Sequence, residues 1–584
     1  MVNNFVIKKY EFNEFWKQKI AQEDKGRNRP VVYLLNNSKL LYVWETSSAA
    51  NRISQHLDDK NKKWLTQINI IFDNTFNKSA ILDIEQSLIQ YFWADNNYKL
   101  MNKNGWQSAK HNYYQREMYM SKFDMIWNEL RREWIAKWDI NDIRNSDLFK
   151  YSPYNTLTVE QERVSRTIIV DIIEKLEKNQ DWSYIIKWWA WTGKTVVLIN
   201  MLYKLINACN MDFDSAIDNP ELSEYVQFIH IIKNFLEKYK WKWMELKIAY
   251  VSPMTSLRAT IKEVFNKTWN WLKWSIVMWP LDVVNNWYKS KEKYDIVFVD
   301  EAHRLAKRKN IWYLKSFDDA AKKCWLEPLT SNLLDFIVRC SKYRVLVYDK
   351  WQTIKWSDIN EYEFKNSLKN SNVNESQLIS QLRCRWWNDY MDYIENIFNC
   401  SQSWKRVVQD YDLKLFDNVN DMVTTIIKLD EKFSLCRNVA WYSWEWISKK
   451  YKSIENIIKD WKEDIIIDGY RYIWNMTNQK WILSGKALET IWCIHTTQWY
   501  DLNYVWIIFW KEIDYDENKK EIIINKNEFY DSNVKKWVTD EELKEYIINA
   551  YKVMMSRWIK WCYLYVCNRW LRDYLSKFMD MAIK

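Results

Sequence analysis

The sequence predicts an α/β protein in which a small α+β domain is followed by two lobes built on parallel sheets. Three observations predict this class. Two β-rich runs at 31–35 and 39–46 surround Asn36-Asn37-Ser38, which is typical of a β-hairpin. An apolar run at 184–186 leads through a turn into Gly193-Lys194-Thr195 and an apolar helical pattern. A second apolar run, 295–299, ends in two acidic residues, as a buried strand of a parallel sheet can.

Composition places broad bounds on the protein. The 584 residues suffice for about three to four domains, and 48% hydrophobic residues support real cores. A net charge of +10, from 86 basic and 76 acidic residues, is compatible with a nucleic-acid partner. The nine cysteines form no C-x-x-C pair and indicate reduced thiols. No apolar run approaches ~18 residues and no signal peptide is visible, so we expect a cytoplasmic protein without a membrane partner.

The glycine and tryptophan counts are unusual. Average glycine usage of roughly 7% predicts about 40 glycines in a chain of this length. The sequence has 5 glycines and 40 tryptophans. Some bacterial lineages read the codon UGA as glycine, and translation with a code that assigns UGA to tryptophan would print those glycines as tryptophan. We therefore interpret many of the tryptophans as glycine in the organism. The alternative is a truly tryptophan-rich protein whose loops are inert.

Residues 188–195 are the central motif. Read with glycine for tryptophan they become GGAGTGKT, a phosphate-binding loop between a strand and a helix. Lys194 would reach the β- and γ-phosphates of ATP, and the Thr195 hydroxyl would ligate Mg²⁺. Indole side chains would obstruct the close backbone approach that such a loop needs. The candidate nucleotide-binding residues here are Trp188, Trp189, Ala190, Trp191, Thr192, Gly193, Lys194 and Thr195.

The apolar run 295–299 continues into Asp300-Glu301-Ala302-His303. About 105 residues separate this DEAH sequence from the GKT, counting from Thr195 to Asp300. Asp300 would hold Mg²⁺ through water, and Glu301 would polarise the attacking water. The alternative is an acidic cap at the end of a strand.

A third set of residues lies in the N-terminal part. Tyr33 and Tyr42 occupy the two runs of the hairpin, Arg52 and His56 share one face of the next helix at i, i+4, and Glu85 lies on a helix predicted at 79–93. With Trp44 read as glycine, this set resembles the GIY-YIG nuclease family, from which the valine in the first motif departs. Phosphodiester hydrolysis requires a base, a cation and a metal ion.

The resemblance implies a role for each of these residues. Tyr33 and Tyr42 are the paired tyrosines, one of which is the proposed base, and Arg52 is the catalytic arginine. His56 is an auxiliary group, and Glu85 holds one Mg²⁺ or Mn²⁺. Asn102 is the closing asparagine, with Asn104 as the weaker candidate. Taken singly, each tyrosine could merely pack and Glu85 could be solvated.

The remaining motifs follow the order of a motor protein. Q-x-R at 381–383, HTTQW at 495–499 and SRW at 556–558 come after DKWQ at 349–352. This order resembles superfamily-one helicases, and most closely the Schlafen-like helicase family. The resemblance implies two RecA-like lobes, ATP and Mg²⁺, and DNA or RNA as the partner. It assigns Gln161 to the adenine, Gln352 to sensing the γ-phosphate, and Arg383 and Arg557 to the transferred phosphate. The alternative for Gln161 is an exposed helical glutamine.

We expect a nuclease domain at 1–110 with a helical lead-in at 1–28, a connector at 111–155 that continues a helix begun near 107, a first lobe at 156–370 and a second lobe at 371–584. Residues 514–540 indicate surface hairpins or inserts. The predicted function is an ATP-dependent helicase or translocase fused to a metal-dependent endonuclease. The alternative is a nucleotide-gated nucleic-acid-binding ATPase, a sensor or remodeller, with an inactive nuclease domain.

Overall fold

The computed structural model describes most of the chain. The residues outside its description are 1–4, 23–28, 61, 103–113, 156, 177–179, 189–192, 208–229, 236, 238–245, 268–273, 310, 350–351, 354, 379–386, 407–411, 434, 442, 452–453, 476–489, 498–501, 531–534, 536–537, 557 and 583–584. Contacts divide the chain into two units. The first is residues 1–180, 193–250 and 258–278, and the second is 181–192, 251–257 and 279–584.

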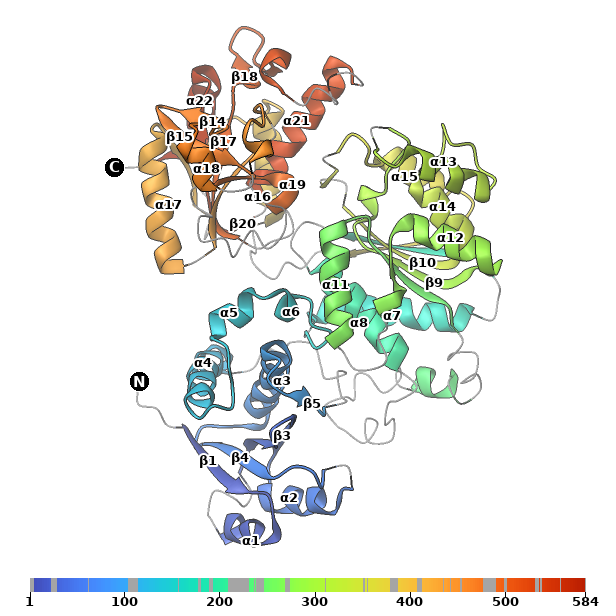
Figure 1. Cartoon of the computed structure of the whole chain (residues 1–584), viewed down its shortest axis with the longest axis vertical. Coiled ribbons are helices and arrows are strands. Elements are labelled where there is room, and N and C mark those ends of the chain that lie inside the picture. The colour runs from blue at the N-terminus through green and yellow to red at the C-terminus, as the bar shows by residue number, and fades with distance from the viewer. Residues whose placement is uncertain are drawn as a thin grey trace. The chain divides into compact units, whose positions relative to one another are not determined.

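The first unit begins with a five-stranded sheet of order β1-β4-β2-β3-β5. All neighbouring strands are antiparallel except β3 and β5, which are parallel. Figure 1 shows α1 and α2 on one side of this sheet and α3 and α4 on the other. The elements are β1 (Phe5–Glu11), α1 (Glu14–Gln22), β2 (Val31–Asn36), β3 (Leu40–Thr46), α2 (Ala49–Asp58), β4 (Gln67–Asp73), α3 (Lys78–Asp95), β5 (Lys99–Leu100) and α4 (Arg116–Arg132).

The predicted hairpin and the two helices that follow it are confirmed. β2 and β3 pair antiparallel, and every residue of β2 is buried. The lead-in helix predicted for residues 1–28 is wrong at its start, because residues 5–11 form β1 and only 14–22 are helical. β1 pairs with β4, where Phe5 faces Asp73. A strand whose partner lies so far along the chain leaves no local turn signal in the sequence.

The rest of the first unit is largely helical. The connecting helix is three helices, α4, α5 (Ile140–Asn145) and α6 (Asp147–Lys150), so the loop predicted from residue 145 contains a helix. The predicted amphipathic helix before the phosphate loop is confirmed as α7. Other elements whose residues lie wholly or partly in this unit are α7 (Val159–Lys175), α8 (Lys194–Asn207), β7 (Ile248–Val251), α11 (Thr255–Lys267), η3 (Trp274–Ile276) and β8 (Val277–Met278).

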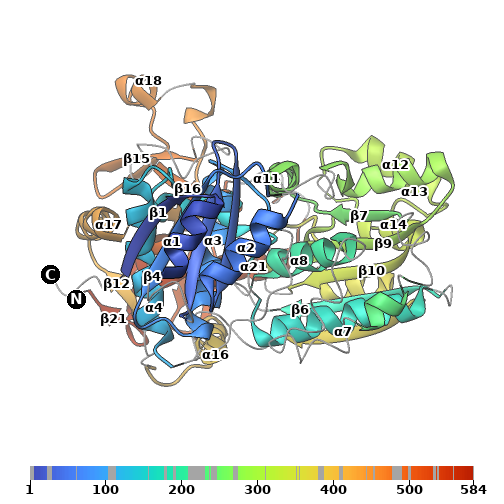
Figure 2. The ribbon, with the colours of Figure 1, turned by 90° about the horizontal axis from the view of Figure 1, so that it is seen from below.

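The second unit contains four parallel strands that lie side by side in the order β11-β6-β10-β9, within a six-stranded sheet. Figure 2 shows β6, β10 and β9 as neighbours. The polar strand β11 is at the sheet edge. The elements here are β6 (Trp182–Trp188), α12 (Pro280–Ser290), β9 (Tyr294–Val299), η4 (Ala302–Arg304), α13 (Leu314–Lys323), α14 (Leu333–Cys340), β10 (Ser341–Tyr348), α15 (Glu361–Ser367) and β11 (Asn372–Leu378).

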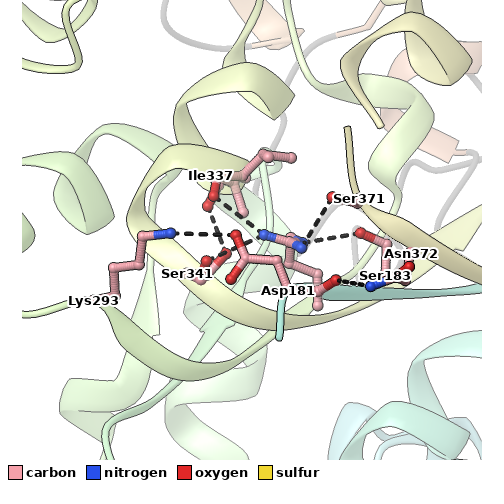
Figure 3. Close-up of polar contacts among 9 residues, drawn as sticks. Asp181, Ser183, Lys293, Ile337, Ser341, Ser371 and Asn372 are labelled. Carbon is pink, nitrogen blue, oxygen red and sulfur yellow. Dashed lines mark hydrogen bonds and ion pairs between the residues drawn. The ribbon is translucent and has the colours of Figure 1, made fainter. Parts of the chain in front are cut away.

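A buried arginine joins the amino ends of these strands. The Arg344 guanidinium on β10 donates to the Ser183 hydroxyl at 2.9 Å and to the Ser371 hydroxyl at 3.1 Å. It also donates to the carbonyl oxygens of Val338 and Ser341, both at 3.1 Å. Figure 3 shows Ser183, Ser341 and Ser371 converging there, beside the ion pair of Asp181 with Lys293. Burial lowers the Arg344 pKa to about 10, and the charge of Asp181 opposes this shift.

A second, eight-stranded sheet completes this unit, with order β14-β15-β16-β13-β17-β20-β12-β21. Its pairs are parallel except β14 with β15. One core packs α16, α21 and α22 on one face, and another packs α17 on the other face. Its main elements are α16 (Trp387–Phe398), β12 (Asp412–Phe416), α17 (Val419–Phe433), β13 (Cys436–Ala440), β14 (Ile465–Ile467), β15 (Tyr470–Trp474), β16 (Thr490–Cys493), α19 (Ile494–Thr497), β17 (Leu502–Phe509), α21 (Asp540–Met555), β20 (Trp558–Val566), α22 (Arg569–Ser576) and β21 (Asp580–Met581).

Smaller elements lie between these strands and helices. The predicted surface hairpin near 514 is present as an antiparallel pair. Across the described residues, no helix has the length and apolar character that a membrane crossing requires. The small elements are η6 (Ser448–Lys450), α18 (Ile454–Lys459), β18 (Ile513–Asp516), β19 (Glu521–Ile524) and η8 (Lys526–Glu528).

Candidate functional site

The N-terminal sheet brings the predicted tyrosines and histidine together. Tyr33 on β2 is fully buried, and its hydroxyl lies 2.7 Å from Nε2 of His56 on α2. The Tyr42 ring on β3 meets the same imidazole edge-on, with 5.3 Å between ring centroids. Arg52, one turn before His56, has its guanidinium carbon 5.4 Å from the centre of the Trp44 ring. The hairpin and α2 therefore gather four of the predicted residues.

Charges in this cluster act on both tyrosines. Burial raises the pKa of Tyr33 well above its ordinary value, Tyr42 and Glu85 raise it further, and Arg52 lowers it. Burial also raises the pKa of Tyr42, followed by the charge of Glu85, while Arg52 lowers it. Glu85 on α3 is 1% exposed. Because Glu85 and Arg52 act on both phenols, the carboxylate and the guanidinium belong to the same electrostatic environment.

Asn102 holds the strand that carries Tyr42. Its Nδ2 donates to the Val43 carbonyl at 2.6 Å, and its Oδ1 accepts from the Val43 amide at 3.0 Å. This two-bond contact fixes the backbone beside Tyr42. The alternative candidate, Asn104, lies outside the described residues.

A divalent cation fits the chemistry of this cluster. Mg²⁺ is commonly held by one or two carboxylates together with waters and substrate phosphates. Glu85 supplies one buried carboxylate of this kind. Among the described residues no group of three His, Cys, Asp or Glu side chains forms a cation cage. Elsewhere among the described residues, seven cysteines, all between positions 324 and 567, are free thiols.

The structure describes the two ends of the phosphate-loop motif, the backbone of Trp188 and residues 193–195. β6 ends at Trp188, whose side chain lies outside the description, as do Trp189, Ala190, Trp191 and Thr192. Gly193 has φ of +72°, in the left-handed region that glycine tolerates. Lys194 and Thr195 form the first turn of α8, and Lys194 is 6% exposed. The strand predicted before the loop and the helix predicted after it are confirmed.

Gln161 lies beside that glycine and is not an exposed helical residue. It is 2% exposed, and a side chain at position 193 would place its Cβ 3.6 Å from Nε2 of Gln161. Its Oε1 accepts from the Thr158 amide at 2.8 Å, while the Thr158 hydroxyl accepts from the Gln161 amide at 3.2 Å. These bonds form a capping box at the start of α7. Its contact with adenine stays a prediction.

The DEAH residues lie at the carboxyl end of β9. Asp300 is fully buried, and its Oδ1 accepts from the Glu301 amide at 3.0 Å. Glu301 has φ of +51°, a left-handed backbone that is uncommon for glutamate and often marks a functional site. Nε2 of His303 lies 3.0 Å from Oε2 of Glu301. Asp300 offers a carboxylate of the type Mg²⁺ prefers, so the cation fits here as well.

Gln352 reaches the same sheet edge from the neighbouring strand. It follows β10, which is parallel to both β9 and β6, and its Nε2 donates to Asp349 at 2.7 Å. The carboxyl ends of β6, β9 and β10 therefore share one edge of the sheet, where ligands of open parallel sheets bind.

The two predicted arginines, Arg383 and Arg557, lie outside the described residues. Around the HTTQW motif, α19 covers residues 494–497, and α21 ends at Met555, just before the last motif. The sequence reasoning missed Lys62, whose Nζ lies 2.7 Å from Nδ1 of His56. It sits in a turn after α2, where no periodic pattern points to it.

The fold is a mixed α/β architecture with parallel sheets. In the six-stranded sheet, the edge formed by the carboxyl ends of the strands carries the DEAH residues, an acidic motif typical of nucleotide-hydrolysing enzymes. Residues 183–568 match the family model described as Schlafen group 3, DNA/RNA helicase domain. This match covers more than half of the chain, and the protein belongs to that family. The Schlafen-like resemblance is thereby confirmed, and such a helicase-like domain implies ATP and Mg²⁺. The match begins after the N-terminal sheet.

Two further likenesses accompany the family match. The uncharacterized protein YPL245W of Saccharomyces cerevisiae is 23% identical over 464 residues, which cover 72% of this chain and 91% of that protein. The crystal structure of the Pif1 helicase from Candida albicans aligns with 72% of this chain and 96% of that chain. Its identity is 11% and its TM-score is 0.26.

Proposed function

We propose that this protein is an ATP-dependent nucleic-acid helicase or translocase fused to a metal-dependent GIY-YIG endonuclease that cuts phosphodiester bonds. The observation that carries the nuclease half is the contact of Tyr33 with His56 beside Tyr42, Arg52 and the buried Glu85. The family match supports the helicase half. The proposed parts are the nuclease domain at 1–110, the connector at 111–155, and RecA-like lobes at 156–370 and 371–584.

In the nuclease domain, Arg52 would stabilise the charge that develops on the cleaved phosphate. Mg²⁺ or Mn²⁺ held by Glu85 would stabilise the leaving oxygen. Tyr33, with its hydroxyl against His56, would take part in removing a proton from the attacking water. Asn102 would keep β3 and Tyr42 in place through its two bonds to Val43.

In the helicase-like part, Lys194 would bind the β- and γ-phosphates of ATP, and Thr195 and Asp300 would hold Mg²⁺. Glu301 would position the attacking water, and Gln352 would respond to the γ-phosphate. Arg383 and Arg557 would neutralise the transferred phosphate, and Gln161 would contact the adenine side of the nucleotide. DNA or RNA is the proposed partner, with hydrolysis moving it so that the nuclease domain can cut it.

This proposal includes glycine at many of the printed tryptophans. Trp134, Trp325 and Trp461 have φ of +58°, +57° and +53°, and their side chains are 89%, 66% and 68% exposed. Each follows the end of a helix, and the amide after it bonds back to a carbonyl five residues earlier, at 2.9, 2.9 and 3.0 Å. That helix ending is one that glycine occupies because it has no Cβ. These three sites support the UGA interpretation.

Activity assays on the full chain with glycine at positions 44, 188, 189, 191, 351, 499 and 558 test the function. We expect ATP hydrolysis that Lys194→Ala abolishes, and nicking of plasmid DNA with Mg²⁺ that Glu85→Ala abolishes. Equal nicking by wild type and Glu85→Ala would remove the nuclease claim. ATP hydrolysis without strand displacement would favour the nucleotide-gated alternative. Ordinary UGG codons at those positions would overturn the glycine interpretation.

A further inference from the structure

Three side chains form a continuous hydrogen-bonded chain inside the N-terminal sheet domain. Nζ of Lys62 lies 2.7 Å from Nδ1 of His56, and Nε2 of His56 lies 2.7 Å from the Tyr33 hydroxyl. The exposed fraction is 12% for the Lys62 side chain, 4% for His56 and zero for Tyr33. These hydrogen bonds therefore connect a partly exposed turn, which carries Lys62, with the buried phenol of Tyr33 in the proposed nuclease site.

The surroundings of Lys62 are mixed in charge. Asp59 lies 3.6 Å from Nζ, and the centre of the Tyr42 ring lies 3.9 Å from it. Burial lowers the pKa of Lys62 to about 8, the Asp59 carboxylate raises it, and the Arg52 guanidinium lowers it. For His56, burial, then Lys62, then Arg52 lower the pKa to about 3, and Asp59 opposes them. His56 is therefore neutral near pH 7, whereas Lys62 exchanges its proton close to that range.

The charge on Lys62 determines which atom donates and which accepts in each of these hydrogen bonds. An ammonium group can only donate, so Nδ1 of His56 accepts, and its Nε2–H donates to the oxygen of Tyr33. A neutral amine can accept instead, so Nδ1–H donates to Lys62 and Nε2 accepts from the Tyr33 hydroxyl. Only in the second state is the Tyr33 oxygen available to receive a proton from another molecule while its own proton leaves.

We propose that Lys62 is the terminal proton acceptor of a relay through His56 and Tyr33 that activates the attacking water, an inference that rests on the proposed nuclease function. A water proton passes to the Tyr33 oxygen, the Tyr33 proton passes to Nε2 of His56, and the Nδ1 proton passes to Nζ of Lys62. The resulting hydroxide forms a bond to phosphorus, and the bond to the leaving sugar oxygen breaks. The leaving oxygen takes its proton from solvent, and Lys62 returns its proton to solvent.

This relay avoids a free phenolate. Burial raises the pKa of Tyr33 far above neutrality, so the ionised phenol is a rare species. A concerted transfer needs no such species, because the charge ends on Lys62. Lys62 acts through His56 and Tyr33, so it is a positioning residue in this scheme.

The first test is the pH dependence of nicking by the glycine-restored full chain with Mg²⁺. The rate should rise about tenfold per pH unit below about pH 8 and level off above it. Lys62→Arg keeps a positive charge but does not deprotonate, so it should lose this rise and cut on the order of 100-fold more slowly at pH 8. Lys63→Met, at an exposed neighbouring lysine, should keep the wild-type profile. A Lys62→Arg variant with the wild-type profile would overturn the proposal.

The second test requires no cleavage. The chain has 5 histidines, so ¹⁵N-histidine labelling gives few signals, and His56→Gln assigns the relevant pair. The protonated ring nitrogen of His56 should change from Nε2 to Nδ1 as the pH passes about 8. This change should be absent in Lys62→Arg, and its absence in wild type would overturn the relay. The change without any nicking would support the coupling of Lys62 to His56 and remove the proposed nuclease function.

Discussion

Glu162 on α7 and Lys204 on α8 form a buried ion pair, with 2.6 Å between Oε2 and Nζ. Burial lowers the pKa of Lys204, and the Glu162 carboxylate opposes that shift. Arg166 lies 3.8 Å from the same carboxylate. The pair joins the helix that carries Gln161 to the helix that begins at Lys194, so it supports the glycine that lies against Gln161.

Removing one partner of this pair should be costly. Glu162→Leu leaves the Lys204 ammonium buried without its carboxylate, and we expect a loss of about 3–5 kcal/mol in the free energy of unfolding. The double variant Glu162→Leu with Lys204→Met should recover most of that loss, because the buried ammonium is removed together with its carboxylate partner. Urea unfolding measures both. Equal losses in the single and double variants would contradict the explanation.

Arg344 should contribute strongly to the stability of the second unit. Arg344→Met removes its bonds to two serine hydroxyls and two carbonyl groups at the amino ends of the strands. We expect a loss of about 2–4 kcal/mol in urea unfolding. Lys342→Met on the same strand is the matched control. Its side chain is 37% exposed beside Asp295, so it should cost under about 1 kcal/mol.

Glu512 should make stability depend on pH. Burial raises its pKa to about 7 from an ordinary value of 4.5, although the Tyr551 hydroxyl donates to it. Between these values the folded chain binds more protons than the unfolded chain, so its contribution to the free energy of unfolding falls as the pH rises. The fall is about 3 kcal/mol and is complete above pH 7. Glu512→Gln should remove it, whereas Glu541→Gln at an exposed site should not.

Glycine at the three left-handed helix ends should stabilise the chain. Trp134→Gly, Trp325→Gly and Trp461→Gly should each add about 1 kcal/mol, because the Cβ clash in that backbone conformation disappears. Thermal unfolding under identical conditions measures the gain. Trp404→Gly is the control, since Trp404 is 66% exposed but lacks a positive φ. A similar gain at position 404 would show that the effect comes from removing an exposed indole.

Glu301 should be required for ATP hydrolysis but not for nucleotide binding. Glu301→Gln keeps the size of the side chain and removes its charge, so hydrolysis in the glycine-restored chain should fall on the order of 100-fold or more. Binding of a fluorescent nucleotide should be retained. Glu292→Gln, before the start of β9 at the opposite end of the strand, is the matched control. Hydrolysis by Glu301→Gln at the wild-type rate would exclude the role given to this carboxylate.

Local patterns predicted much of the fold. A clear hydrophobic periodicity or a continuous apolar run marks each of three elements. They are the hairpin that carries Tyr33 and Tyr42, the helix that carries Glu85, and the strand before Asp300. β1 was missed because its pairing with β4 is long-range, and only two of its residues, Phe5 and Tyr10, are buried, so its sequence lacks the alternation of a half-buried strand. The capping role of Gln161 was readable from Thr-x-x-Gln at 158–161, a signature the functional interpretation overlooked.

The contacts within the site were less predictable. Spacing placed Arg52 and His56 on one helix face, but it gave no information on Lys62, which reaches His56 from a turn. The left-handed backbone of Glu301 likewise depends on how the chain leaves β9. Such relationships arise from tertiary packing, which acts between segments that share no local pattern.

The polar edge strand β11 has a consequence for solubility. It pairs with β6, whose residues 183–186 are buried. Its own residues include asparagine and serine, and its Glu375 forms an ion pair with Lys187 of β6. A polar, charged edge discourages pairing with the sheet of another molecule. A truncated chain that ends before Asn372 would leave the backbone N–H and C=O groups on this side of β6 unpaired beside its apolar side chains, and we expect it to aggregate where the full-length protein remains dispersed.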